Sequence, residues 1–208
     1  MAIAFNKLLI PVDFSLNTGL AIKKATGLIT ADKTVLHLLH VVNPYQPVEA
    51  LAARTQLEEL GRRTKEDHPE AAVRTHILKG VSPQRMIIEC AKMLNPDLIV
   101  IGKHNPRRHW PFSNLHHWLP FQSISPATLA RKTNCPVLTA KPGSIDSRTR
   151  LIVIPIRDFL PERKLEWGIL LAKKYKAQIH LLALFAVQHT PNKRDGIEIA
   201  NRAHGYFH

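Results

Sequence analysis

The sequence predicts an α/β protein with a Rossmann-like open parallel sheet of five strands, helices on both faces, and a partial second repeat. Short apolar runs, typical of strands buried on both faces of a sheet, alternate with stretches at helical spacing. Gly, Pro and polar residues separate these segments, as expected of turns. The same alternation restarts after residue 150, which indicates an internal repeat. Alternating strands and helices imply right-handed βαβ units.

Residues 1–141 contain the five strands. The first, Lys7–Phe14, is an apolar run that ends in polar residues. The strongest helix prediction is Val48–His68, which is rich in good helix formers and is stopped by Pro69. Ser82 is the predicted N-cap of a further helix, with Pro83 at its first position. The other predicted segments are helices at Leu16–Thr30, Pro83–Leu94 and Ser125–Thr133, and strands at Val35–Val42, Val73–Lys79, Asp97–Gly102 and Pro136–Ala140.

Residues 142–149 are polar and turn-rich and are predicted to be a linker. After them, Leu151–Arg157 echoes the first strand and Ile179–Phe185 echoes the second. Residues 150–208 are therefore predicted to be an incomplete β-α-β repeat, since a full copy needs three more strands. Such a unit leaves apolar surface uncovered, so we expect a partner: the first domain, another chain, or residues beyond this sequence. We interpret the chain as a shortened tandem protein.

Composition and charge restrict the classes of function. Of the 208 residues 45% are hydrophobic and 22% are charged, as in globular proteins. No run approaches the ~18 apolar residues of a membrane span, and no signal peptide is recognisable, so we predict a cytoplasmic protein without membrane contact. The net charge of +13 favours anionic partners. Cys90 and Cys135 have no metal-ligand spacing and are predicted to be buried structural thiols.

Four segments resemble the universal stress protein family. They are Ile-Pro-Val-Asp-Phe-Ser at 10–15, Leu-His-Val-Val at 39–42, Asp-Leu-Ile-Val-Ile-Gly at 97–102, and Leu-Ala-Arg-Lys-Thr-Asn-Cys-Pro-Val-Leu at 129–138, the most specific. The resemblance implies the strand order 3-2-1-4-5 and a homodimer paired through the last strand. It also implies that ATP or another adenine nucleotide is a possible ligand, because some members bind ATP and others do not.

In the members that bind ATP, an Asp ending strand one and a Val in strand two hold the adenosine. Asp13 and Val41 match these positions, with Pro11 and Val12 leading into the site. A carboxylate at residue 13 can accept hydrogen bonds from an amine or a ribose hydroxyl. An N-cap or turn role for Asp13 has equal weight. In the second repeat Arg157 takes the place of Asp13, so adenosine should not bind there in the same way.

The phosphate side departs from the family pattern of two closely spaced glycines followed by Gly-Ser or Gly-Thr. Gly102 is present, but the second glycine is Asn105, and Ser123 and Ile124 replace the Gly-Ser pair. The usual triphosphate cradle is therefore predicted to be absent. In its place the loop carries Lys103, Arg107 and Arg108 together with Trp110, Phe112 and Trp118.

Three interpretations of this basic, aromatic loop stay open. Its cations could grip phosphates directly, its aromatics and cations together could bind single-stranded nucleic acid, or the aromatics could pack the loop onto the domain or a partner. The packing interpretation has the most weight and nucleic acid the least. His109, His116 and His117 lie in the same loop without a carboxylate or thiol, so no metal is predicted.

No motif for a catalytic nucleophile, a P-loop or a metal-activated water is present in the sequence. We therefore predict a cytoplasmic stress-response protein that acts as a non-enzymatic regulatory or interaction module with degraded or altered nucleotide binding. One alternative is an ATP-binding, at most slowly hydrolysing, member whose basic loop replaces the glycine cradle. A lower alternative is a nucleic-acid binder.

Overall fold

The computed structural model describes residues 5–29, 34–102, 124–141, 149–156 and 162–183. The chain divides into two compact units, one within residues 4–146 and the other within residues 147–208. None of the helices in the described ranges is long and apolar enough to span a bilayer.

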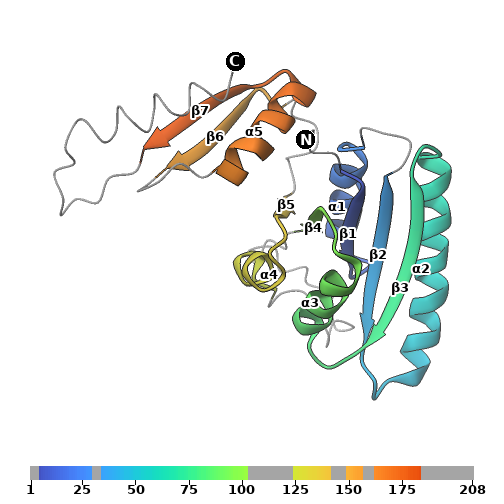
Figure 1. Ribbon diagram of the computed structural model, residues 1–208. Helices are drawn as coiled ribbons and strands as arrows, with labels where there is room; N and C mark the ends of the chain where they lie inside the picture. Colours follow the sequence, from blue (N-terminus) through green and yellow to red (C-terminus); the bar gives the residue numbers. More distant parts are fainter. Residues whose placement is uncertain (1–4, 30–33, 103–123, 142–148, 157–161, 184–208) are drawn as a thin grey trace, which may run out of the picture. The chain divides into compact units, whose positions relative to one another are not determined.

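The first unit is built on a five-stranded sheet with the order β3-β2-β1-β4-β5, in which all neighbours are parallel. The predicted fold class and strand order are thus confirmed (Figure 1). Leu8, Leu9 and Ile10 of the central strand are fully buried, because a parallel sheet is covered on both faces. The strands are β1 Lys7–Val12, β2 Val35–Val42, β3 Ala72–Lys79, β4 Leu98–Gly102 and β5 Val137–Ala140.

Two helices cover each face of this sheet (Figure 1). α1 (Leu16–Thr26) and α2 (Pro47–Asp67) lie on one face, and α3 (Pro83–Leu94) and α4 (Pro126–Thr133) on the other. The second pair packs against a core cluster shared with three strands. That cluster consists of Leu9, Leu39, Val41, Ile87, Cys90, Ala91, Ile99, Ile101, Leu129 and Cys135.

Helix ends in the first unit follow local sequence signals. Ser82 caps α3 as predicted, its hydroxyl accepting from the backbone N–H of Arg85 at 3.5 Å. Ser125 caps α4 in the same way. Both helices end at an asparagine in the left-handed region, Asn95 with φ 46° and Asn134 with φ 52°. Asparagine tolerates this conformation better than other non-glycine residues, which explains why these helices stop there.

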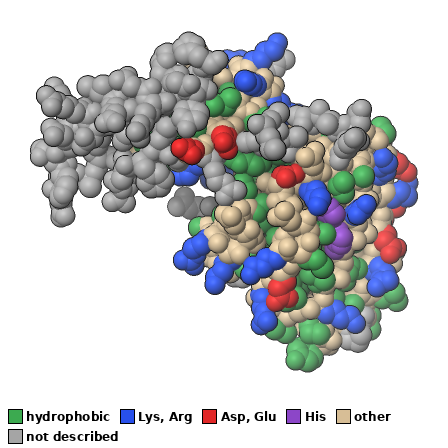
Figure 2. All heavy atoms as spheres, in the orientation of Figure 1, with side chains coloured by type: hydrophobic (Ala, Val, Ile, Leu, Met, Phe, Trp, Pro, Cys, Tyr) green, Lys and Arg blue, Asp and Glu red, His purple; other side chains and the backbone are tan. Residues whose placement is uncertain are grey.

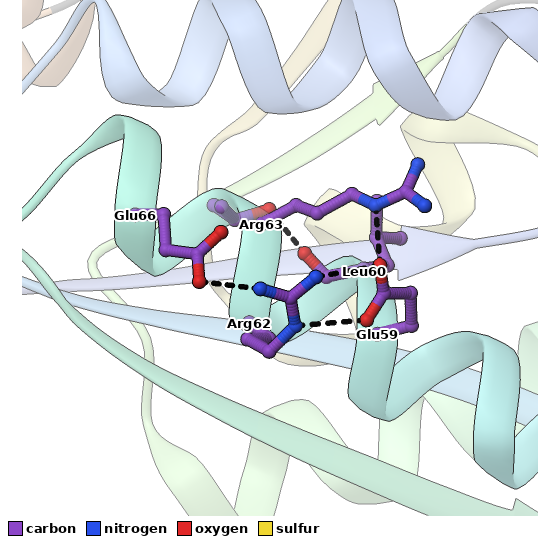
Figure 3. A network of polar contacts seen from close by, with 6 residues as sticks. Glu59, Leu60, Arg62, Arg63 and Glu66 are labelled. Atoms are coloured by element: carbon purple, nitrogen blue, oxygen red, sulfur yellow. Dashed lines mark hydrogen bonds and ion pairs between the residues drawn. The ribbon is translucent and has the colours of Figure 1, made fainter.

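The outer face of α2 carries a charged network (Figure 3). The guanidinium of Arg62 contacts Glu59 through two nitrogens at 2.9 Å and also pairs with Glu66. Arg63 donates to Glu59 at 2.6 Å. All four side chains are exposed and stand three or four residues apart, the spacing of neighbours on a helix surface. The network supports the helix and faces solvent, so it is no candidate for a binding site.

The second unit contains a two-stranded parallel sheet of β6 (Leu151–Ile156) and β7 (Gln178–Ala183), joined by α5 (Glu162–Tyr175). Its register repeats that of the first unit: Pro155 pairs with Leu182 as Pro11 pairs with Leu39. The similarity between the two units that the sequence predicts thus extends to the pairing of their first two strands. One face of this sheet is open, because Leu151, Val153 and Leu182 are 46%, 50% and 50% exposed.

Candidate functional site

Strand order reverses between β1 and β4, and ligands of open α/β sheets bind beyond the carboxyl ends of the strands at such a point. β1 pairs with β2 as far as Val12, but its pairing with β4 stops at Leu9. Pro11 has no N–H with which to extend that second ladder. The two central strands therefore separate just before Asp13.

A pocket of about 130 Å³ lies at this end of β1 and β2. Typical sites for a whole small ligand measure roughly 300–1,000 Å³, so this pocket has room for only one ring or group of a ligand. Its lining comes from the ends of β1 and β2 and from the segment that leads into α2. The lining residues are Asp13, His40, Val41, Val42, Asn43, Gln46 and Glu49.

The carboxylate of Asp13 uses one oxygen to build the start of α1. Oδ1 accepts from the N–H of Ser15 at 3.0 Å, from its hydroxyl at 2.6 Å, and from the hydroxyl of Thr18 at 2.7 Å. Thr18 Oγ1 in turn accepts from the backbone N–H of Asp13 at 3.0 Å. In the described part of the chain no hydrogen bond reaches Oδ2. Asp13 therefore has a structural role, and a second oxygen remains for a ligand.

His40 stands beside Asp13 and has a defined tautomer. Its Nδ1 lies 2.7 Å from the carbonyl oxygen of Val12, which only accepts, so Nδ1 carries the proton. The ring also contacts Phe14, with centroids 4.6 Å apart. Burial lowers the pKa of His40, against the opposing effects of the Val12 hydrogen bond and of Asp13. The neutral ring thus leaves Nε2 as an acceptor.

Phe14 adopts φ 56°, a conformation that is unusual for a bulky residue. The chain turns here from β1 into α1, so the predicted strand Lys7–Phe14 is two residues too long at its end. Ser15, and not Asp13, is the N-cap of α1: its hydroxyl accepts from the N–H of Asn17 at 3.2 Å. The positive φ aims Asp13 and Ser15 at one another across this turn.

Gln46 and Glu49 close the pocket on the α2 side. Gln46 Nε2 donates to Glu49 Oε1 at 3.0 Å. The amide oxygen of Gln46 is buried and has no hydrogen-bond partner among the described residues. Buried amide oxygens normally have a partner, so this group marks a place where a donor from a ligand or water would be favourable. Together with Asp13, these side chains make the pocket acidic and rich in acceptors.

Gly102 ends β4 and lies against α1. A Cβ at this position would be 2.2 Å from the backbone oxygen of Asn17 and 2.5 Å from its carbonyl carbon. Those atoms belong to the first turn of a helix, so they cannot move away cheaply. The glycine is therefore required for the packing of β4 on α1, whatever it contributes to a ligand.

The structure brings Asp13 and Val41 together in one pocket, as the strand ends predict. Pro11 and Val12 are buried behind them in β1. Lys103, Arg107 and Arg108 lie outside the described residues. Sequence reasoning did not single out His40, Asn43, Gln46 and Glu49 as site residues, although His40 stands directly before Val41 in the segment that carries the family resemblance.

Both cysteines are buried, as predicted, and neither forms a disulfide. Burial raises the pKa of the Cys90 thiol to about 11, so it is protonated and inert at neutral pH. Within the described ranges no cluster of three or more His, Cys, Asp or Glu side chains could hold a metal ion.

The fold and this site define an open parallel α/β protein with a small acidic pocket at the carboxyl ends of β1 and β2. The chain belongs to the universal stress protein family, whose model matches residues 4–141. A comparison with curated proteins gives no match.

Solved structures with this fold include proteins longer than this chain. A universal stress protein from Archaeoglobus fulgidus is 18% identical, with a TM-score of 0.66 over 98% of this chain and 75% of its own. A functionally unknown protein from Pseudomonas aeruginosa is 20% identical, with a TM-score of 0.56 over 97% and 67%. A universal stress protein in complex with cAMP is 21% identical, with a TM-score of 0.47 over 67% and 98%.

Proposed function

We propose that this chain is a stress-response protein that acts as a non-enzymatic regulatory or interaction module and retains the nucleoside half of a nucleotide site. The functional domain is residues 1–141, followed by the linker 142–149 and the incomplete repeat 150–208. The observation that carries the proposal is the carboxylate of Asp13, which lines the pocket beside Val41 with Oδ2 unused by the described fold.

The chemistry of the pocket supports a donor-rich, uncharged group as its ligand. Its described lining holds two carboxylates, Asp13 and Glu49, and the unpartnered oxygen of Gln46, but no Lys or Arg. A ribose or an adenine amine offers the donors that these acceptors need. Phosphate groups would be repelled by the carboxylates. Any phosphate contact must therefore come from other residues, and we propose Lys103, Arg107 and Arg108 for that role.

A regulatory role is favoured over catalysis by the state of the polar groups in the pocket. Nδ1 of His40 is engaged by the Val12 carbonyl, and Oδ1 of Asp13 is saturated by three donors. Among the described residues that line the pocket there is no Ser, Thr, Cys or Lys to act as a nucleophile. These features support binding without turnover.

Calorimetric titration of the full chain with adenosine and with ATP tests the proposal. Because the pocket recognises the nucleoside and the glycine cradle is altered, we expect the two affinities to lie within about tenfold of each other. Asp13→Asn keeps an acceptor for the α1 turn and replaces the free oxygen with a donor. This substitution should weaken the binding of adenosine by about tenfold to a hundredfold, which corresponds to the loss of one hydrogen bond to a charged group.

Ser15→Ala is the matched control, because it removes contacts of Asp13 Oδ1 without touching Oδ2. It should lower stability and leave the affinity for adenosine nearly unchanged. Absence of adenosine and ATP binding would overturn the nucleoside part of the proposal.

The second candidate, a true ATP-binding member, is favoured by the run without Asp or Glu between Asp97 and Asp146, which contains the basic loop. In that case ATP should bind at least about a hundredfold more tightly than adenosine, and Arg107→Gln with Arg108→Gln should abolish the difference. Strongly salt-dependent binding of oligonucleotides without nucleotide binding would favour the nucleic-acid alternative instead.

A further inference from the structure

Two histidines meet on the sheet face that carries α3 and α4. Nδ1 of His37 on β2 lies 2.8 Å from Nε2 of His76 on β3, and the rings stack with centroids 5.1 Å apart. His37 is 3% exposed and His76 is half-buried. In the register, His37 pairs with Arg74 and Leu39 pairs with His76, so all four side chains belong to one face.

This part of the face is left open by the helices. Gly61 of α2 lies against Val73 and Thr75, so α2 covers the opposite face of β3. On the α3 side, Arg74 and Ala72 of β3 are exposed. The space-filling view presents this side of the sheet and shows histidine between Lys and Arg side chains (Figure 2). The histidine pair thus lies next to the exposed, basic side chain of Arg74.

Cations surround the pair. Burial, and after it His76, Arg74 and Lys7, together lower the pKa of His37 to about 4. Burial and Arg74 also lower the pKa of His76. Lys7, on β1, places its Nζ 3.3 Å from the carbonyl oxygen of Leu94 at the end of α3.

A carboxylate beside the backbone of Lys7 already accepts two hydrogen bonds. Asp97, before β4, accepts through Oδ2 from the backbone N–H groups of Asn6 and Lys7, both at 2.8 Å. A nearby carboxylate would raise the pKa of a histidine, and none is among the described groups that act on His37 or His76. The surroundings of the pair therefore have positive charge without a compensating anion from the described residues.

The hydrogen bond between the rings determines what a ligand would meet. In the neutral pair, one ring donates to the other, which leaves one outer nitrogen as a donor and one as an acceptor. Uptake of one proton turns both outer nitrogens, Nε2 of His37 and Nδ1 of His76, into donors and adds a positive charge. A bound anion would stabilise this protonated form, just as the surrounding cations disfavour it when no anion is present.

We propose that His37, His76, Arg74 and Lys7 form a binding site for a dianionic oxyanion, a sulfate or a phosphate group, and that binding takes up a proton. The guanidinium of Arg74 suits such a ligand because it can donate two parallel hydrogen bonds. The site is distinct from the nucleoside pocket: His37 precedes Val41 by four residues, about 13 Å along an extended strand. A transition metal is disfavoured, since two flanking cations oppose it and the described residues supply only two ligands.

Sulfate is the best first probe, because it stays dianionic from pH 5 to 8 and any pH dependence then belongs to the protein. Sulfate is titrated into the full chain at constant ionic strength, balanced with chloride, while the imidazole nitrogens are followed by NMR. We expect sulfate to shift the signals of His37 and His76 and to raise their titration midpoints. Its affinity should fall by up to about tenfold per pH unit above pH 5, the limit for uptake of one proton.

Three variants separate the site from general attraction to a basic protein. Arg74→Gln should weaken the binding of sulfate by about tenfold or more. Because Arg74 is exposed, the fold should tolerate this substitution. His76→Gln should weaken binding and remove most of its pH dependence. Arg54→Gln makes the same charge change at an exposed residue of α2, and its sulfate affinity should match that of the unmodified chain.

Glycerol phosphate, used next to sulfate, identifies the source of the anion. Equal effects on the imidazole signals indicate a free oxyanion, and a stronger effect of glycerol phosphate indicates an esterified phosphate; both support the site. Unchanged imidazole signals with both probes overturn it. So does an equal loss of affinity in Arg54→Gln and Arg74→Gln, or tight binding of Zn²⁺ by the histidine pair in place of the anion.

Discussion

At the scale of single residues, the carboxylate of Asp13 combines two roles that the sequence alone presents as alternatives. Oδ1 holds the turn into α1 through Ser15 and Thr18, and Oδ2 of this pocket-lining side chain accepts no hydrogen bond from the described residues. A carboxylate has enough lone pairs for both tasks. The fold thereby fixes the orientation of the side chain before any ligand arrives, which lowers the entropic cost of binding.

The hydroxyl of Thr18 is a test of that turn. It is buried, donates to Asp13 Oδ1 and accepts from the N–H of Asp13. Thr18→Val keeps the shape but leaves both groups short of a partner, so it should lower the free energy of unfolding by about 1–3 kcal/mol. Thr55→Val on the exposed side of α2 is the control and should change it by less than about 0.5 kcal/mol. Urea denaturation measures both, and equal effects would contradict the role of Thr18.

Two glycines give a matched pair with opposite expectations. Gly102→Ala places a Cβ 2.2 Å from the backbone oxygen of Asn17 and should destabilise the fold by about 1–3 kcal/mol or more, as overpacking does. Gly19 lies exposed in α1 with nothing within 4 Å of a Cβ. Gly19→Ala should stabilise the fold by about 0.5–1 kcal/mol. Thermal unfolding of both variants measures these changes. If Gly102→Ala left the melting temperature unchanged, β4 would have to be able to shift away from α1.

At the scale of elements, the strength of local signals decides how much could be predicted. The apolar strand β2 and the capped helix α3 match their predicted bounds, because burial and the Ser82 cap with Pro83 are local signals. The predicted end of β1 is two residues too late, because no residue type near Phe14 signals its positive φ. The contact of His37 with His76 depends on the β2–β3 register, which arises from packing across 39 residues of chain.

The charged network of α2 should contribute to acid sensitivity. Its arginines, first Arg62 and then Arg63, lower the pKa of Glu59 from the ordinary 4.5 to about 2. A lowered carboxyl pKa adds stability that is fully present above pH 4.5 and is lost as the pH falls towards 2. Glu59→Gln should flatten this part of the profile of melting temperature against pH. The effect should be small and should shrink in high salt, because the network is exposed.

The β2–β3 histidine pair should act in a separate pH window. The pKa of His37 is about 4 in the folded chain and near 6.5 when unfolded, so the unfolded state binds more protons between these values. The free energy of unfolding therefore decreases as the pH falls from 6.5 towards 4. His37→Gln should make that decrease shallower. A melting temperature equally pH-dependent in both proteins over this range would contradict the assignment.

At the scale of the whole molecule, the exposed sheet face of the second unit bears on how the chain associates. A parallel sheet is normally covered on both faces, but β6 and β7 expose Leu151, Val153 and Leu182 on one of theirs. β5, at the edge of the five-stranded sheet, offers a second route to association, the one that the family resemblance implies. Both routes predict a dimer with a second copy of the chain, and they differ in which residues it needs.

Substitutions separate these two routes. Val153→Lys with Leu182→Lys places two charges on the open face of β6 and β7, where burial in a dimer would be costly. If that face associates, sedimentation should show a loss of dimer, whereas Met93→Lys, at a 69% exposed site of α3, should not change it. Val137→Pro, in edge strand β5, removes one donor for strand pairing and should weaken a dimer built there.

Of these two routes, we expect the open face of β6 and β7 to contribute more to the stability of the dimer. Apolar burial stabilises association at roughly 25 cal/mol per Å², and solvated edge groups gain far less net free energy. A dimer that survives the paired lysines and is lost in Val137→Pro would show instead that β5 is the main interface.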